Sequence, residues 1–131
     1  MNLNNKKIIF SVNKLIANYS QTFHFKLKIQ LKNSNEFCES KHSTKYEKNK
    51  QELNLNEILE LNILNSTIIN KNSILQFFLL IYTKSGYKNA GIAELLISEI
   101  KNNSNNKIEI LKCVLGKGIF EIKIEINFNL I

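Results

Sequence analysis

The sequence contains no aspartate, arginine, proline or tryptophan. Its eighteen lysines outnumber the eleven acidic side chains, all of which are glutamate. A bias toward AT-rich codons accounts for the missing arginine, proline and tryptophan. It does not account for the missing aspartate, whose codons are about as AT-rich as those of glutamate. Because aspartate is the usual carboxylate ligand of calcium and magnesium and a common catalytic acid or base, its absence argues against both kinds of site.

Cysteine and histidine are also scarce, with only Cys38, Cys113, His24 and His42 present. This set is too small for a disulfide-rich scaffold and lacks the four clustered ligands of a structural zinc site. We expect both thiols to be reduced and unpaired, and both histidines to be incidental. The sequence also shows no catalytic Ser/His/acid or Cys/His arrangement and no phosphate-binding loop. We therefore expect no enzyme activity, no metal and no cofactor.

The length of 131 residues and the mass of 15.2 kDa predict one domain over residues 1–131. An N-terminal domain of a longer protein would have the same features. The longest unbroken apolar run, residues 77–82, is too short to cross a bilayer, and the N-terminal residues lack a secretory signal. The net charge of +7 favours an anionic partner, which could be nucleic acid, a membrane surface or an acidic protein.

Alternation of apolar and polar residues indicates β-strands along most of the chain. Residues 23–31 alternate strictly, and residues 108–115 and 119–128 repeat the pattern on either side of a glycine-containing turn. Residues 73–83 are almost continuously apolar, as in a central strand. Residues 51–64 and 91–100 are compatible with either a helix or a strand. Short strands at close spacing predict an all-β, antiparallel sandwich.

Three motifs, taken in order, resemble those of a C2 domain. The segment Phe25–Ile29 resembles a strand in which lysines alternate with apolar residues, and Leu55–Leu61 resembles Trp-Asn-Glu-x-Phe-x-Phe with leucine for each aromatic residue. Tyr87–Ile100 is similar to the N-terminal C2 (NT-C2) subfamily, found in EH-domain-binding, oestrogen-induced-gene and plant organelle-movement proteins. The resemblance extends from Lys7 to Phe128 and implies an eight-stranded antiparallel Greek-key sandwich. Within the second motif we interpret residues 55–57 as structural.

The resemblance also bears on calcium. C2 domains that depend on calcium hold it with aspartates from loops at one end of the sandwich. The corresponding loops here, near residues 18–21 and 83–88, contain no acidic residue and include Lys84 and Lys88, which would repel a cation. We therefore expect a calcium-independent domain.

Four lysines form the candidate binding site. Lys26 and Lys28 are expected on the solvent-facing side of the strand over residues 23–31. The resemblance implies that Lys41 and Lys45 extend a concave lysine-rich patch that binds phosphoinositide headgroups. Ammonium groups near an anionic leaflet gain roughly 1 kcal/mol each. The alternative is that these lysines only keep an exposed sheet soluble and its edge unpaired.

Residues in the two loops are weaker candidates for membrane contact. They are Tyr19, Lys84, Tyr87 and Lys88. Tyrosine is common at membrane interfaces, although packing of both tyrosines in the core or at its rim is the alternative.

We therefore expect a calcium-independent module, cytoplasmic and peripheral to an intracellular or plasma membrane, that binds anionic phospholipids or phosphoinositides and tethers a larger protein or complex there. The alternative is a C2 scaffold that binds protein partners in a cytoskeletal, ciliary or cortical complex without lipid. Nucleic acid is not an expected partner, because the sequence lacks arginine and a glycine-rich loop, and no aromatic residue is interleaved with the basic face.

Overall fold

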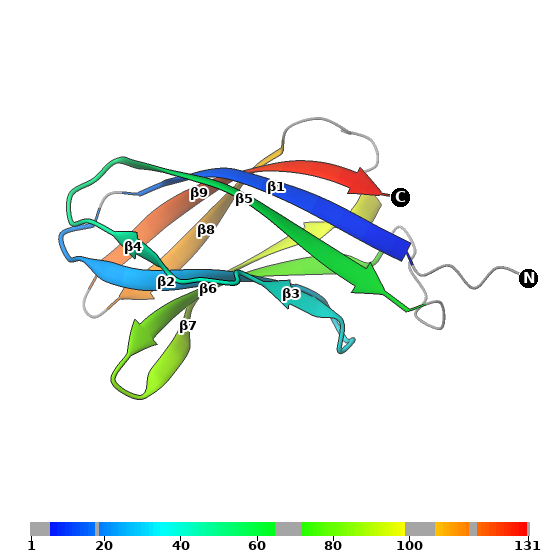
Figure 1. Cartoon of the computed structure of the whole chain (residues 1–131), viewed down its shortest axis with the longest axis horizontal. Helices are drawn as coiled ribbons and strands as arrows, with labels where there is room; N and C mark the ends of the chain where they lie inside the picture. Colours follow the sequence, from blue (N-terminus) through cyan, green and yellow to red (C-terminus); the bar gives the residue numbers. More distant parts are fainter. Residues whose placement is uncertain (1–5, 18, 65–71, 99–106, 116–117, 131) are drawn as a thin grey trace, which may run out of the picture.

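The computed structural model describes residues 6–17, 19–64, 72–98, 107–115 and 118–130, with side chains for residues 7–17, 19–64 and 72–98. These residues form nine strands, and every strand pairing among them is antiparallel (Figure 1). The strands are β1 (Lys6–Ile16), β2 (Phe23–Leu31), β3 (Phe37–Glu39), β4 (Thr44–Tyr46), β5 (Glu52–Ile63), β6 (Ile74–Thr83), β7 (Gly86–Leu96), β8 (Lys107–Leu115) and β9 (Gly118–Leu130).

The strands form two layers of a β-sandwich. Their hydrogen-bonded order is β3-β2-β6-β7-β8-β9-β1-β5, and β4 pairs with β2 beside β3. The path bends at β7 and β8, which pair only at Gly91↔Cys113 and Ile92↔Lys112. One layer therefore holds β2, β6 and β7, and the other holds β9, β1 and β5 (Figure 1). The predicted all-β antiparallel sandwich is confirmed.

The strand count differs from the expected eight because the segment beside β2 is divided into β3 and β4. Ser40 lies at the division and is almost fully buried. Its Oγ accepts a hydrogen bond from Leu27 N at 3.0 Å, and its backbone N donates to Leu27 O at 2.9 Å. A side-chain oxygen thus replaces a backbone carbonyl in the ladder, and residues 41–43 leave the sheet before β4 begins.

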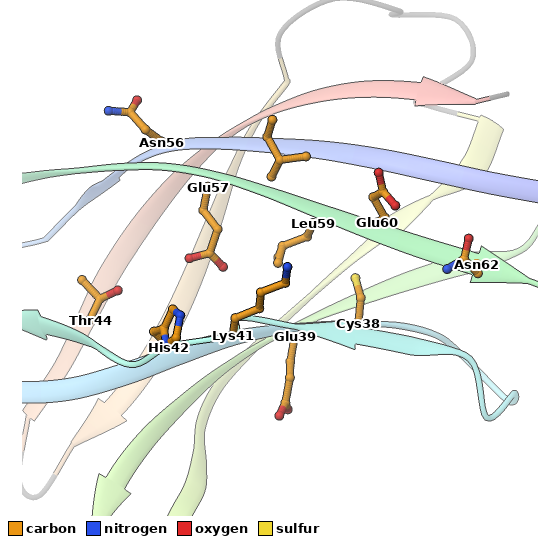
Figure 2. Close-up of a pocket in the computed structure, with 11 residues that line it drawn as sticks. Cys38, Glu39, Lys41, His42, Thr44, Asn56, Glu57, Leu59, Glu60 and Asn62 are labelled. Atoms are coloured by element: carbon orange, nitrogen blue, oxygen red, sulfur yellow. The ribbon is translucent and has the colours of Figure 1, made fainter.

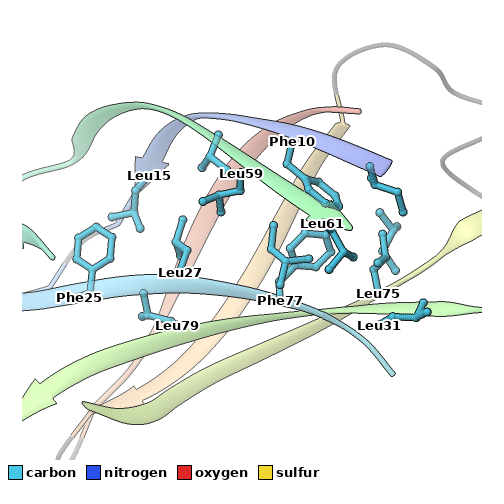
Figure 3. Close-up of a cluster of buried hydrophobic side chains, with 14 of the residues drawn as sticks. Phe10, Leu15, Phe25, Leu27, Leu31, Leu59, Leu61, Leu75, Phe77 and Leu79 are labelled. Atoms are coloured by element: carbon cyan, nitrogen blue, oxygen red, sulfur yellow. The ribbon is translucent and has the colours of Figure 1, made fainter. Parts of the chain in front are cut away.

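The core lies between the two layers (Figure 3). Alternate residues of β2 point inward, as its sequence predicts, and meet the inward side chains of β1, β5 and β6. Phe10 and Phe77 join the layers in an edge-to-face contact with ring centroids 6.0 Å apart. Each fully buried aliphatic or aromatic side chain contributes about 1.5–3 kcal/mol of transfer free energy. The two layers therefore bury a continuous hydrophobic core, which is the main source of favourable free energy in this part of the chain.

Both segments that could have been helices contain strands. Residues 51–64 contain β5. Residues 91–96 belong to β7, residues 97–98 are helical, and residues 99–100 lie outside the described part of the chain. The predicted C-terminal hairpin is confirmed by the pairing of Leu115 with Gly118. Its turn residues 116–117 and the polar segment 102–106 are also outside the described residues.

Tyr46 holds together one end of the sandwich. Its ring is fully buried and stacks on Phe23, with centroids 4.9 Å apart. Its hydroxyl donates to Lys50 O at 2.6 Å and accepts from Tyr19 N at 3.0 Å. The connection after β4 is thereby fixed to the connection between β1 and β2.

Candidate binding face

The candidate lysines lie on a sheet surface that faces away from the core. Strand pairing aligns Lys28 with Phe78 and Ile92, and aligns Lys26 with Leu80. Because side chains alternate between the two sides of a strand, one surface collects every second residue of each strand. We call this surface the outer face. It comprises His24, Lys26, Lys28 and Gln30 of β2; Ile74, Gln76, Phe78, Leu80 and Tyr82 of β6; Tyr87, Asn89, Ile92, Glu94 and Leu96 of β7; and Phe37, Glu39 and Lys45 at its edge.

Aromatic rings lie beside the lysines of the outer face. Lys26 Nζ lies 4.8 Å from the ring centroid of Tyr87. Lys28 Nζ lies 4.7 Å from the ring of Phe37 and 5.7 Å from that of Phe78. A cation over an aromatic face gains about 0.5–1 kcal/mol at an exposed site. These contacts explain why both lysines are half-buried rather than fully exposed.

This arrangement corrects one step of the sequence argument. The polar side of the alternating segment 23–31 contains lysines but no aromatic residue. The sequence therefore predicted no aromatic residue beside these lysines. The rings come from β3, β6 and β7, which long-range pairing brings next to β2. The expectation that aromatic residues are not interleaved with the basic face is therefore wrong.

The outer face is also unusually apolar for an exposed surface. Among the described residues, seven large hydrophobic side chains are exposed, and five of them are on this face: Phe37 (53%), Tyr82 (59%), Tyr87, Ile92 (45%) and Leu96. Contiguous exposed apolar patches on soluble proteins commonly mark interaction sites. The outer face thus combines apolar side chains with the ammonium groups of Lys26, Lys28 and, at its edge, Lys45.

The other two candidate lysines lie in different places. Lys45 is opposite His24, so it belongs to the outer face, where its Nζ lies 3.1 Å from Glu47 Oε1. Lys41 follows β3 and instead lines a groove facing β5. The structure therefore brings Lys26, Lys28 and Lys45 onto one surface and places Lys41 on another.

At the opposite end of the outer face, charges neutralise one another. Lys32 Nζ lies 3.2 Å from Glu94 Oε2, and Gln76 Nε2 donates to the same oxygen at 2.8 Å. The hydrogen bonds from Gln76 and then Lys32 hold the pKa of Glu94 below its usual value. In contrast, neither Lys26 nor Lys28 forms an ion pair with any side chain that the structure describes. Glu39 is the cross-strand partner of Lys28 on this face, so the positive charge least offset by acidic side chains is that of Lys26, beside Tyr87.

The four loop candidates also lie in different parts of the structure. Tyr19 packs against the core, with its ring edge-to-face with Phe23 at 5.9 Å, which is the packing alternative left open by the sequence. Tyr87 lies on the outer face in an edge-to-face contact with Tyr82 at 5.3 Å. Lys84 and Lys88 are exposed on the β6–β7 hairpin, which projects from the sandwich (Figure 1). Three of the four thus border the outer face or its hairpin.

No protein-family model matches this chain, and no curated protein is similar to it in sequence. Among solved structures it is similar to a C2 domain of plant extended synaptotagmin 1, with a TM-score of 0.57. The alignment covers 100% of this chain and 98% of that one, at 12% sequence identity. This chain has the fold of a C2 domain. The NT-C2 subfamily remains a prediction from the sequence motifs.

In this C2 fold, the β1–β2 and β6–β7 connections lie at the same end, because Phe25 near the start of β2 pairs with Ile81 near the end of β6. Neither connection carries a carboxylate in its described residues, 17, 19–22 and 84–85. No group of three or more His, Cys, Asp or Glu side chains among the described residues is arranged to hold a metal ion. No helix in the same part of the chain is long and apolar enough to cross a membrane.

Proposed function

We propose that this C2-fold domain is a calcium-independent, non-catalytic module that docks on anionic intracellular membranes through its outer face, and so tethers a larger protein or complex. The observation that carries the proposal is the pairing of Lys26 and Lys28 with aromatic rings on an exposed, partly apolar surface. Lysines would attract phospholipid or phosphoinositide headgroups, and aromatic side chains would lie at the headgroup level.

The expected strength of this attraction is modest. Each lysine near an anionic leaflet contributes about 1 kcal/mol, and the effect falls off within a Debye length of about 10 Å at 0.1 M salt. Lysine also binds phosphate as a point charge, without the bidentate geometry of arginine. We therefore expect binding that depends on the density of anionic lipid and on salt more than on one headgroup.

A second candidate function is protein interaction, and one observation favours it. Strand β6 is apolar on both sides, with Leu75, Phe77 and Leu79 in the core and mostly apolar residues on the outer face. Strands apolar on both sides are typical of sheets covered on both faces. A partner protein with an acidic rim around an apolar patch would cover this one.

Vesicle flotation tests the membrane proposal. The vesicles would contain phosphatidylcholine alone, or with phosphatidylserine or phosphatidylinositol bisphosphate, each with calcium and with chelator. The double variant Lys26→Gln, Lys28→Gln should bind anionic vesicles about 10- to 30-fold more weakly, since two lysine contributions are lost. The matched control is Lys48→Gln, Lys50→Gln, which removes the same charge from exposed positions outside the outer face and should cost much less.

Equal losses in the two double variants would show that net charge, not the outer face, determines binding. No measurable binding of the wild type to any anionic vesicle would overturn the membrane proposal, and binding only with calcium would overturn its calcium independence. A single-stranded RNA oligonucleotide belongs in the same series, because the interleaved rings and lysines also resemble a stacking platform. RNA binding without vesicle binding would reject the membrane proposal in favour of nucleic acid.

A further inference from the structure

The two ends of the strand order, β3 and β5, face each other across a groove on the side of the sandwich (Figure 2). The groove has a volume of about 640 Å³. Cys38, Lys41 and His42 line it on one side, and Glu57 and Leu59 of β5 line it on the other. Among the described strands, β5 pairs only with β1, so its other edge borders the groove without a partner strand.

The composition of β5 makes this edge unusual. Proteins commonly protect an edge strand by keeping it short or by placing lysine or proline in it. Strand β5 has twelve residues and contains no lysine, although the chain has eighteen. It contains three glutamates instead, Glu52, Glu57 and Glu60. The edge is therefore long, unpaired and acidic in a strongly basic chain.

Regular alternation along β5 directs Glu57 inward, on the same side as the buried Leu59 and Leu61. The β1–β5 register shifts between Val12↔Glu57 and Lys14↔Asn54, and Asn56 has a φ of +48°. The irregularity begins on the N-terminal side of Glu57, which itself stays in register with Leu59 and Leu61 opposite the buried Val12. Glu57 points from β5 toward the segment after β3 (Figure 2), and Glu60 also lines the groove.

Glu57 lacks the compensation that the other two glutamates have. Glu52 and Glu60 lie 3.9 Å and 3.7 Å from the ammonium groups of Lys14 and Lys7. Glu57 Oε1 is shielded from solvent and accepts no hydrogen bond from the described residues. Burial raises the pKa of the Cys38 thiol to about 12; the charge of Glu57 adds to this effect, and a backbone hydrogen bond from Ile29 opposes it. Cys38, which lies across the groove from Glu57, therefore stays neutral. The groove thus holds a carboxylate oxygen that lacks a donor.

We propose that the free edge of β5 binds an extended basic segment of a partner protein by strand addition, with a lysine or arginine of that segment reaching Glu57. Main-chain hydrogen bonds to the edge would supply affinity, and side-chain pairing would supply specificity. A second copy of β5 is a poor occupant, because it brings further glutamates and no lysine. This surface is separate from the lysines of the outer face, so the inference does not depend on membrane binding.

The probe is a blocked heptapeptide in which lysine alternates with valine, titrated into the ¹⁵N-labelled full chain. Amide shifts should change along residues 56–62 of β5, and the backbone amides on its free edge should become protected from exchange. Glu57→Gln should weaken binding about tenfold, because a charge-assisted contact is lost. The matched control is Glu52→Gln, the same substitution on the same strand outside the groove, which should change affinity less than about twofold.

Two peptide controls test the mode of binding without altering the protein. The same peptide with alternate N-methylated amides cannot complete a β-ladder and should not bind, and a version with glutamate for lysine should not bind either. The inference is overturned if the lysine peptide shifts only outer-face amides, if the N-methylated peptide binds equally well, or if Glu57→Gln and Glu52→Gln have the same effect. Concentration-dependent dimerisation that protects β5 would also overturn it, in favour of a second copy as the occupant.

Discussion

Tyr46→Phe removes one oxygen atom from a fully buried side chain whose hydroxyl makes two hydrogen bonds to the backbone. The ring would stay buried and stacked on Phe23, so the hydrophobic contribution should be unchanged. The hydroxyl hydrogen bonds to Lys50 O at 2.6 Å and from Tyr19 N at 3.0 Å would be lost. The substitution therefore isolates the polar tie between two connections.

The expected loss follows from these two bonds. A protein hydrogen bond contributes a net 0.5–1.5 kcal/mol, so the free energy of unfolding should fall by about 1–3 kcal/mol. This is a large share of the roughly 5–15 kcal/mol that stabilises a typical domain. The upper half of the range applies if water cannot reach Lys50 O and Tyr19 N after the hydroxyl is removed.

Equilibrium unfolding in urea measures the effect. The midpoint should fall with an unchanged slope, because the substitution alters stability and not the surface exposed on unfolding. Tyr82→Phe is the matched control, since Tyr82 is 59% exposed and its substitution should change the free energy by less than about 0.5 kcal/mol. Equal effects of Tyr46→Phe and Tyr82→Phe would refute the argument that the buried hydroxyl holds this end of the sandwich.

Two further predictions concern buried polar groups near β3. Ser40→Ala leaves Leu27 N without the acceptor that lies 3.0 Å away, and should lower the free energy of unfolding by about 1–2 kcal/mol. The control is Thr22→Ala, which removes an exposed side-chain acceptor of Lys48 N and should lower the free energy of unfolding by less. In a Cys113→Ala background, Cys38 should react with a disulfide reagent far more slowly in the folded chain than in urea at pH 8, because burial raises its pKa to about 12. Since the folded state favours the protonated thiol, this contribution to stability should be complete below pH 9 and disappear as the pH rises toward 12. Equal labelling rates in the folded and unfolded chain would contradict the burial of Cys38.

The fold was largely predictable because its signal is local. Alternation over residues 23–31 predicted both the strand β2 and which of its side chains are buried. Residues 52–63 were harder to assign, since Leu and Glu at mixed spacing suit a helix as well as a strand. Pairing with β1 decides in favour of a strand, and pairing partners are not visible in a single sequence. The division of β3 from β4 depends on one side-chain hydrogen bond and had no comparable signal.

The candidate site was predictable only in part, for the same reason. Alternation placed Lys26 and Lys28 on one side of β2, and the structure agrees. The rings over these lysines come from three other strands, so the sequence around them gave no indication of a mixed aromatic and basic surface. The resemblance to C2 domains grouped Lys41 with Lys45, but Lys41 follows the interruption at Ser40 and lines the groove. Glu57 was interpreted as structural, yet one oxygen of its carboxylate lacks the partner that such a role requires.

The net charge of +7 is a sum over the whole chain, and it does not distinguish two surfaces that favour partners of opposite charge. It predicts an anionic partner for the chain as a whole, and Lys26 and Lys28, neither of which forms an ion pair among the described residues, agree with that prediction on the outer face. The same sum conceals β5, whose twelve residues hold three glutamates and no lysine, and whose partner should be cationic. Electrostatic attraction between exposed groups is local because salt screens it within about 10 Å at 0.1 M. Among the described residues Glu39 belongs to both the outer face and the groove, so the two surfaces adjoin at β3 and differ in which charges dominate on either side of it.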